Sequence, residues 1–218
     1  MFFLPFSILL LLIFILLLPF FFFLIQIEII RIALGKLGLS PTMAFLILFL
    51  SLIGSTINIP IYVREVSFIP PQKSIFFLFH PFGMPEVGTK QIIAINVGGA
   101  IIPILLCIYL FPKAPALPTF FATLISIIIC FRISKVIPGI GVTVPALIPP
   151  IVAVVLAYIF SPENKIPVAY ISGVLGVLIG ADLLNLPNLG KFPGVMSIGG
   201  AGVYDGIFLV GIFSALLA

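Results

Sequence analysis

Residues 1–27 read MFFLPFSILLLLIFILLLPFFFFLIQI and contain no charged side chain. About 20 predominantly apolar residues are enough for a helix to cross the hydrocarbon core of a bilayer, so this stretch predicts a membrane-spanning helix. The stretch lacks a basic start and exceeds the apolar core of a signal peptide, which indicates a retained helix rather than a cleaved leader. The segment Glu28–Leu39 is expected to continue this helix along the membrane surface.

The rest of the chain shares this apolar character. Its 218 residues are 62% hydrophobic and only 7% charged, with a net charge of +4, whereas a soluble domain carries about 25% charged residues. This composition cannot supply the polar shell of a soluble enzyme or nucleic-acid binder, and it also excludes a disordered protein. The sequence therefore predicts a multi-pass protein of the cell membrane. Its partner is the lipid bilayer, no nucleic acid is expected, and its scattered basic residues anchor loops at the headgroups.

Charged residues divide the chain into seven apolar segments that are long enough to span a bilayer. These segments cover residues 1–27, 36–64, 90–113, 113–132, 135–163, 165–191 and 191–218. Backbone polar groups in hydrocarbon must pair internally, so helices rather than strands are expected. The sequence predicts an all-α fold, a polytopic bundle of about seven transmembrane helices that forms a single transmembrane domain over residues 1–218.

Two regions are not expected to be simple helices. Residues 62–89 form the one sizeable loop, which we interpret as an interfacial hairpin or a partly inserted segment. Residues 138–150 are dense in proline and glycine, which predicts an irregular entry to the fifth helix.

Residue types for metal or nucleophile chemistry are scarce. His80 is the only histidine, and Cys107 and Cys130 both lie within hydrophobic runs. Buried apolar packing is the ordinary role of such cysteines. We therefore expect no metal and no cofactor.

Asp182 and Asp205 are the only aspartates, and both lie inside stretches that are otherwise apolar enough to cross a bilayer. Insertion scales give about 2.5–3.5 kcal/mol for an aspartate at the centre of a membrane helix, so such residues are functional candidates. Prolines and glycines predict that the sixth helix ends near Asn185–Leu186 and that the last helix begins near Ser197–Gly202. Asp205 then lies one to two turns inside the last helix, and the two aspartates reach similar depth on antiparallel neighbours.

Two facing carboxylates in a low dielectric do not both ionise easily, and they can share one proton. One carboxylate then activates a water while the other protonates a peptide carbonyl, as in an aspartic protease. Small residues around the pair leave room for a substrate backbone. These are Gly180, Gly199, Gly200, Gly202 and Gly206. Tyr204, beside the second aspartate, either donates a hydrogen bond within the site or anchors at the interface.

Two other functions use the same residues. In a proton- or cation-coupled transporter or channel, the aspartates form the relay, and Asn58, Asn96 and the broken segment 138–150 line the path. In a non-enzymatic membrane scaffold, the glycines mark contacts between helices.

Four segments resemble those of an uncharacterised family of archaeal and bacterial multi-pass membrane proteins. Residues 180–186 (GADLLNL) and 197–209 (SIGGAGVYDGIFL) look like its signature segments. Residues 96–103 (NVGGAIIP) and 145–150 (PALIPP) are similar to two others. The resemblance covers most of the chain after about Asn58, and this family has no established activity.

More distantly, the pattern resembles the intramembrane aspartyl proteases with a Gly-x-Gly-Asp motif: presenilins, signal peptide peptidases and prepilin peptidases. The resemblance implies a presenilin-like helix arrangement, with Asp182 and Asp205 as the catalytic pair and membrane-anchored peptides as substrates. Pro145, Ala146 and Leu147 match the Pro-Ala-Leu tripeptide of presenilins.

The chain departs from that pattern in three places. Tyr204 stands where the motif has its second glycine, and Ala181 precedes the first aspartate where presenilins have tyrosine. Pro145–Leu147 comes before both aspartates, whereas presenilins place the tripeptide after them. A shared role for the tripeptide therefore requires that the fold bring it to the aspartates.

Overall fold

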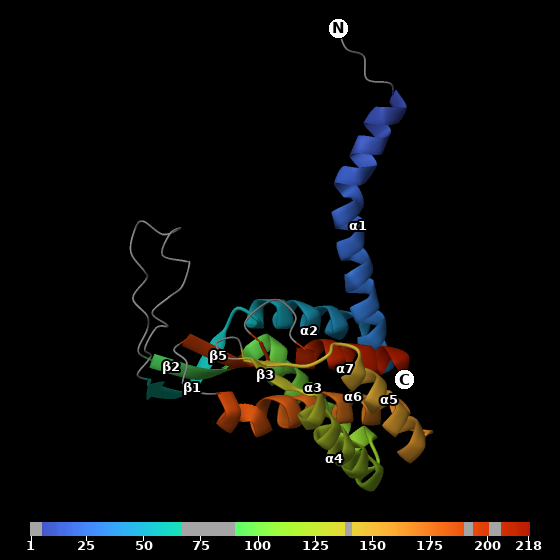
Figure 1. The fold of residues 1–218 in the computed structure, drawn as a ribbon. Coiled ribbons are helices and arrows are strands. Elements are labelled where there is room, and N and C mark those ends of the chain that lie inside the picture. Colours follow the sequence, from blue (N-terminus) through green and yellow to red (C-terminus); the bar gives the residue numbers. More distant parts are fainter. Residues whose placement is uncertain (1–5, 67–89, 138–140, 190–193, 201–205) are drawn as a thin grey trace, which may run out of the picture.

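The computed structural model describes residues 6–66, 90–137, 141–189, 194–200 and 206–218. These residues form seven α-helices, joined by short π- and 3₁₀-helical segments and five strands. The α-helices are α1 (Phe6–Lys36), α2 (Pro41–Gly54), α3 (Ile102–Leu110), α4 (Ala116–Ile133), α5 (Ile148–Phe160), α6 (Lys165–Leu175) and α7 (Gly206–Leu217). The expected number of about seven helices is confirmed for this part of the chain (Figure 1).

Three helical stretches are long and apolar enough to cross a membrane: Ile8–Lys36, Ala116–Ile133 and Lys165–Leu189. They suggest a membrane protein, as the composition predicted. The remaining apolar helices have 10–17 residues, and a helix of α7's length covers only roughly 18 Å of a hydrocarbon core about 30 Å thick. Helix length therefore does not support the prediction that all seven helices span the membrane.

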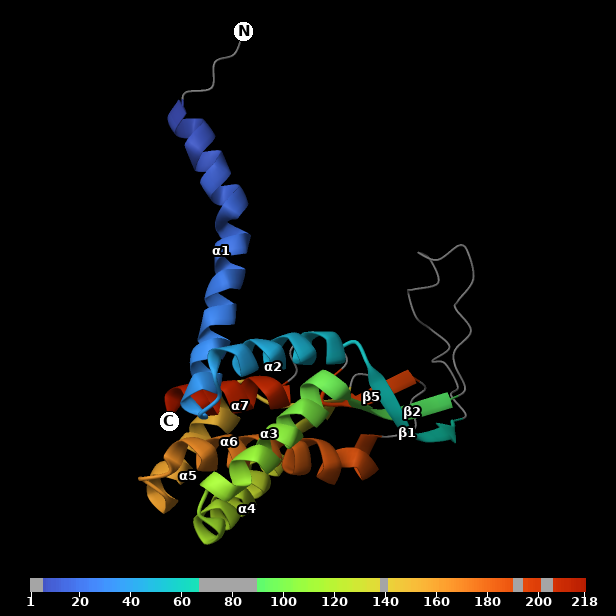
Figure 2. The same ribbon diagram turned by 180° about the vertical axis from the view of Figure 1, so that it is seen from behind.

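Helix α1 projects away from the other elements in both views (Figures 1 and 2). Every residue from Ile8 to Ile25 is exposed, although nearly all of them are apolar. A helix that is hydrophobic on all sides needs an apolar environment on all sides, and lipid provides one. Residues 28–36 continue the same helix, as expected, and carry an ion pair between Glu28 and Arg31.

A three-stranded sheet forms where the sequence predicted the ends of membrane helices and the loops beside them. Strand β1 (Asn58–Glu65) pairs antiparallel with β2 (Lys90–Asn96), and β2 pairs parallel with β5 (Gly194–Ile198). The prediction of an all-α fold is therefore wrong for these stretches.

Strands can form here because the sheet pairs their backbone N–H and C=O groups with one another. Helices are favoured in hydrocarbon for the same reason, since backbone polar groups there must be paired. β-Branched isoleucines dominate β2, as is typical of strands. Pro60, which has no backbone N–H, lies on the edge strand β1, where the register shifts between Pro60 and Tyr62. Edge strands and bulges are the places where a sheet tolerates proline.

The entry to α5 is irregular, as the sequence predicted. Strands β3 (Lys135–Ile137) and β4 (Gly141–Thr143) pair antiparallel, and α5 begins at Ile148 with prolines in its first turn. Residues 138–140 lie outside the described part of the chain, and so do residues 67–89 of the predicted loop. The first residues of that predicted loop, 62–65, belong to β1.

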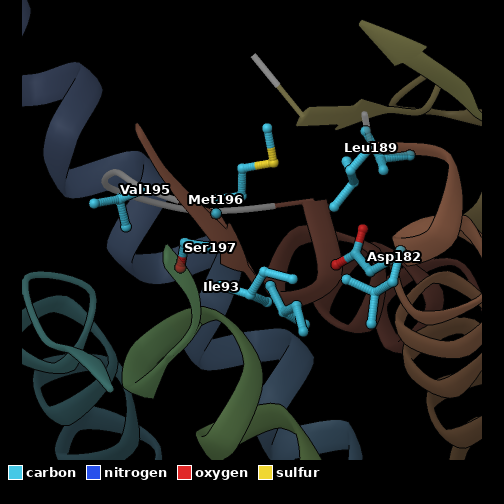
Figure 3. A pocket seen from close by; sticks show the side chains of 10 residues that line it. Ile93, Asp182, Leu189, Val195, Met196 and Ser197 are labelled. Atoms are coloured by element: carbon cyan, nitrogen blue, oxygen red, sulfur yellow. The ribbon is translucent and has the colours of Figure 1, made fainter. Parts of the chain in front are cut away.

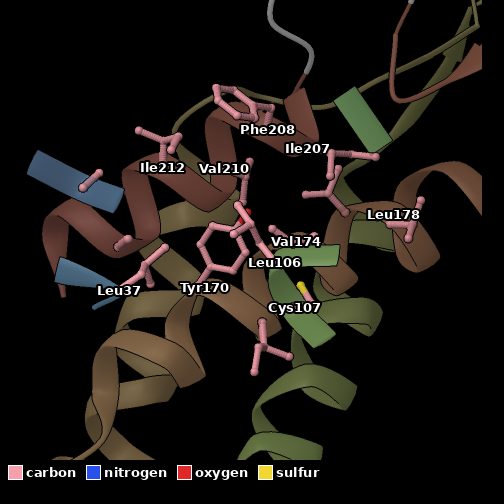
Figure 4. Close-up of a cluster of buried hydrophobic side chains, with 14 of the residues drawn as sticks. Leu37, Leu106, Cys107, Tyr170, Val174, Leu178, Ile207, Phe208, Val210 and Ile212 are labelled. Carbon is pink, nitrogen blue, oxygen red and sulfur yellow. The ribbon is translucent and has the colours of Figure 1, made fainter. Parts of the chain in front are cut away.

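Helix α6 lies at the centre of the helical layer, where it contacts α3, α4, α5 and α7. Its Tyr170 is fully buried, and Figure 4 shows the ring among Leu106, Val174 and Val210. Gly211 on α7 makes room for the ring, because a Cβ there would lie 2.7 Å from Tyr170 Cε2. Close packing of this kind joins α3, α6 and α7 into one hydrophobic cluster.

Beyond α6 the helix continues as the π-helical segment η4 (Gly176–Asp182) and the 3₁₀ segment η5 (Leu183–Leu189). The predicted end near Asn185–Leu186 was therefore a few residues early.

The last helix had been predicted to begin between Ser197 and Gly202, and the early limit of this range is wrong. Strand β5 covers Gly194–Ile198, and Gly199 and Gly200 then adopt left-handed backbone with φ of 82° and 81°. The described part of α7 covers Gly206–Leu217. Residues 201–205 lie outside the described part of the chain, so the placement of Asp205 within the last helix stays a prediction.

Gly176 allows η4 to approach α4 closely. A Cβ added at Gly176 would lie 2.1 Å from Ser126 Oγ, and one at Gly180 would lie 2.3 Å from the carbonyl oxygen of Ile127. Small residues at such contacts are typical of helices that pack in membranes.

We expect Gly176→Ala to lower the free energy of unfolding by about 1–3 kcal/mol, because overpacking forces side chains or backbone to shift. Unfolding in detergent micelles, followed by circular dichroism, measures the loss. Gly35→Ala on α1 is the control, since a Cβ there meets nothing within 4 Å. Adding Ser126→Gly to Gly176→Ala should restore most of the stability, and a double variant no more stable than the single one would refute this contact as the cause.

Asn96 is a fully buried side chain that fastens the sheet to α2. Its Nδ2 donates to the carbonyl oxygen of Ser55 at 2.7 Å and to Asn58 Oδ1 at 3.1 Å, while its Oδ1 accepts the Gly99 N–H at 2.7 Å. Ser197 Oγ also donates to Asn58 Oδ1, so the network extends to β5.

Replacing Asn96 with leucine should destabilise the fold by about 1–3 kcal/mol for each buried group left unpaired. Asn164→Ala is the matched control, because Asn164 is exposed and makes no side-chain capping bond. The same detergent unfolding experiment compares the two variants. Equal stability of both variants would contradict the structural role of Asn96.

Candidate functional site

Asp182 is the last residue of η4 and is partly buried. Its Oδ2 accepts a hydrogen bond from the backbone N–H of Gly199 at 3.4 Å. Glycine suits this position, because φ at Gly199 is +82° and an added Cβ would lie 2.6 Å from the Cβ of Ala100. The turn after β5 thus brings its backbone directly beside the carboxylate.

A cavity of about 130 Å³, the strand cavity, lies on one side of Asp182. Its lining residues are Ile93, Val142, Asp182, Leu186, Leu189, Val195, Met196, Ser197, Ile198 and Gly200. In Figure 3 the Asp182 carboxylate points from its helix toward β5. Among the described residues of this lining, Asp182 alone has an ionisable side chain, and the others are mostly apolar.

A second cavity of about 240 Å³, the proline cavity, also includes Asp182 in its lining. Its lining residues are Val142, Thr143, Val144, Pro145, Ala146, Pro149, Val177, Asp182, Gly206 and Val210. Three segments that are remote in the sequence meet here: the Pro145–Ala146 turn, the end of η4 and the start of α7. Leu147, the third residue of the tripeptide, is 61% exposed and does not line this cavity.

Some of the other residues expected at the site are described by the structure, and the rest are not. Gly200 lines the strand cavity, whereas Gly180 is buried against α4 and serves helix packing. Gly202, Tyr204 and Asp205 lie outside the described residues, so the pairing of Asp205 with Asp182 stays a prediction.

The sequence did not predict the residues that β2 and β5 bring to the strand cavity. Ile93 had been placed in a membrane helix, and Met196 and Ser197 had been placed in the connection to the last helix and at its predicted start. A usable signal was the short β-branched run at residues 92–95, ended by Asn96 and a pair of glycines, which is typical of a strand.

Two other expectations bear on the site. The described residues contain no group of three or more His, Cys, Asp or Glu side chains that could hold a metal ion. Asn58 and Asn96, which a transport path would use, are hydrogen-bonded to each other within the network that fastens the sheet to α2.

Residues 52–217 match the family described as Protein of unknown function (DUF1614). The chain belongs to this family. The match covers the sheet, both cavities and both aspartates, but not α1, and it confirms the uncharacterised family that the motifs predicted. No curated protein and no solved structure matches the chain. Because the family description names no activity, function must be argued from the site itself.

Cysteines placed at neighbouring positions can test whether a small reagent reaches position 182 from outside the protein. Asp182 is partly exposed, whereas Ala181 is fully buried. We expect N-ethylmaleimide to modify Asp182→Cys several-fold faster than Ala181→Cys in detergent, with reaction rates measured by mass spectrometry. The native Cys107 and Cys130 are buried and give a low background. Equal rates at the two positions would contradict an accessible cavity.

Proposed function

We propose that the protein is an intramembrane aspartyl-protease-like peptidase of the cell membrane, in which Asp182 and Asp205 form the catalytic pair. Its substrates are membrane-anchored peptides, in keeping with the apolar surface of the chain. The comparisons assign no activity, so the proposal rests on the site and on the resemblance of its motifs.

The observation that carries the proposal is the lining of the proline cavity. Asp182, Pro145, Ala146 and Gly206 all line it, and Gly206 directly follows Asp205 in the chain. The tripeptide precedes both aspartates in the sequence, so a shared role requires that the fold bring it to them. Pro145 and Ala146, though not Leu147, lie beside Asp182 in this cavity, which supports the proposal.

Strand β5 supplies a means of holding the substrate. It forms one edge of the sheet, whose order is β1-β2-β5 among the described strands, and four of its residues line the strand cavity with Asp182. An extended peptide can add to an exposed edge through backbone hydrogen bonds. In the proposal, a substrate unwound beside β5 presents its carbonyl to the carboxylates.

In the proposed reaction, one carboxyl group is ionised and the other is protonated. The ionised group removes a proton from water as the water oxygen attacks the peptide carbonyl carbon, and the protonated group gives its proton to the carbonyl oxygen. The resulting gem-diol then loses its C–N bond. The nitrogen takes a proton from the first carboxyl group, and a hydroxyl proton returns to the second. The apolar lining favours one shared proton, because a second charge there is poorly solvated.

Cleavage of model transmembrane peptides by the full chain in liposomes tests the proposal. We expect Asp182→Asn and Asp205→Asn each to lower the cleavage rate by about 10²–10⁴-fold, since each removes one acid–base group while keeping the side-chain shape. Mass spectrometry of the products measures the rate and locates the cut.

Glu65→Gln is the control, because Glu65 is an exposed carboxylate at the end of β1. This variant should have the same cleavage rate as the wild type. Equal cleavage by the wild type and both aspartate variants would refute the pair. Cation flux through the same liposomes that requires the aspartates, without cleavage, would establish transport instead.

A further inference from the structure

Three lysines that are far apart in the sequence meet at one cavity. The cavity, which we call the lysine pocket, has a volume of about 290 Å³. Its lining residues are Lys36, Leu37, Gly38, Leu110, Lys113, Glu163, Asn164, Lys165, Ile166 and Pro167. It therefore lies between the end of α1, the turn after α3 and the start of α6, and it gathers three of the ten basic residues of the chain.

Oxygen atoms without formal charge orient each of these lysines. Lys36 Nζ donates to the carbonyl oxygen of Leu216 at 2.7 Å. Lys113 Nζ donates to Tyr109 Oη at 2.8 Å, and Lys165 Nζ donates to Tyr158 Oη at 2.6 Å. Both of these ammonium groups also lie over the ring of the same tyrosine, 4.0 and 4.1 Å from the ring centroid.

The positive charge of the lysine pocket exceeds its negative charge. Within the described residues no lysine of the pocket forms an ion pair, and Glu163 is the one carboxylate in the lining. An ammonium group can donate three hydrogen bonds, so donors remain available for a ligand. The backbone N–H groups of Lys165 and Ile166 lie in the first turn of α6, and such groups favour an anion at a helix N-terminus.

The pocket also lies where three candidate membrane-spanning stretches begin or end. One candidate span ends at Lys36, another starts at Lys165, and the third starts at Ala116, three residues after Lys113. Lysine and tyrosine side chains at span ends are typical of the headgroup region.

A separate apolar groove of about 310 Å³ lies between α3 and α6, and its lining residues are neighbours in the chain of those that line the lysine pocket. Its lining residues are Ile104, Cys107, Ile108, Phe111, Pro112, Ile171 and Leu175. Phe111 follows Leu110 of the pocket, and Ile171 lies about one turn beyond Pro167. The same two elements thus provide a cationic pocket and, next to it, a surface suited to a hydrocarbon chain.

We infer that the lysine pocket binds the phosphate of an anionic phospholipid, one acyl chain of which lies in the groove between α3 and α6. The three ammonium groups recognise the phosphate, and the groove distinguishes a lipid from a free phosphate. Basic pockets between membrane helices recognise lipid headgroups in this way.

Binding of fluorescent dioleoyl phosphatidylglycerol and dioleoyl phosphatidylcholine to the full chain in detergent tests the inference. We expect the wild type to prefer phosphatidylglycerol, and each Lys→Gln change in the pocket to reduce this preference by about fivefold. Lys113→Gln combined with Lys165→Gln should therefore lose most of it.

Arg132→Gln combined with Lys135→Gln is the matched control, because it removes two positive charges near the opposite end of α4. This pair should leave the preference unchanged. An equal loss in both double variants would overturn the inference in favour of a general attraction between charges.

Two further measurements do not depend on the folding of a lysine variant. Glu163→Gln, at an exposed position, should increase the preference for phosphatidylglycerol, because it removes the negative charge from the lining. Unlabelled glycerol 1-phosphate should compete far less well than dihexanoyl or dioleoyl phosphatidylglycerol. If glycerol phosphate competes as well as the lipids, the pocket is a site for free phosphate and the inference is wrong. An unchanged preference for phosphatidylglycerol in Glu163→Gln would contradict lipid binding at the lysine pocket.

Discussion

Strand β2 pairs with β1 along one edge and with β5 along the other, and the surroundings of Asp182 depend on this pairing. Without β5 in register against β2, the Gly199 N–H would not reach the Asp182 carboxylate. The Asn96 network holds the same end of the sheet to α2 through buried hydrogen bonds. In a chain with few polar side chains, backbone pairing is the main source of such bonds, and each one gains strength where water is excluded.

Two of the sixteen charged residues of this protein lie on one helical stretch. Lys165 begins α6 in the lysine pocket, and Asp182 ends η4 between the two cavities. The separation along the helix is roughly 25 Å, most of the thickness of a hydrocarbon core. Glycines between them, such as Gly176, let this stretch pack against α4 with little intervening side chain. One central helix therefore positions both an anion-binding pocket and a candidate acid–base group.

Residue patterns identified much of this arrangement before any coordinates. The apolar segments, the number of helices and the irregular entry to α5 followed from charge spacing and from proline and glycine. The patterns could not reveal that residues 58–65, 90–96 and 194–198 pair as strands. Periodicity does not distinguish a short apolar strand from a piece of membrane helix, and the distinction depends on pairing partners 25 or more positions away along the chain. The same pairing places Ser197 and Ile198 in β5, at the early limit of the predicted start of the last helix.

What the sequence determined by itself is the kind of solvent this chain requires and the rarity of its ionisable groups. Both are properties of composition, and they hold whatever the fold. Asp182 stood out for the same reason, since a carboxylate in an apolar run is costly wherever it lies. Only the tertiary structure decided which groups share a cavity with it: Pro145 and Ala146 from a turn, Gly206 from α7 and Ser197 from β5. Likewise, three lysines spread over 130 positions became one pocket only when α1, α3 and α6 packed together, because proximity in space depends on the packing of elements and not on spacing along the chain.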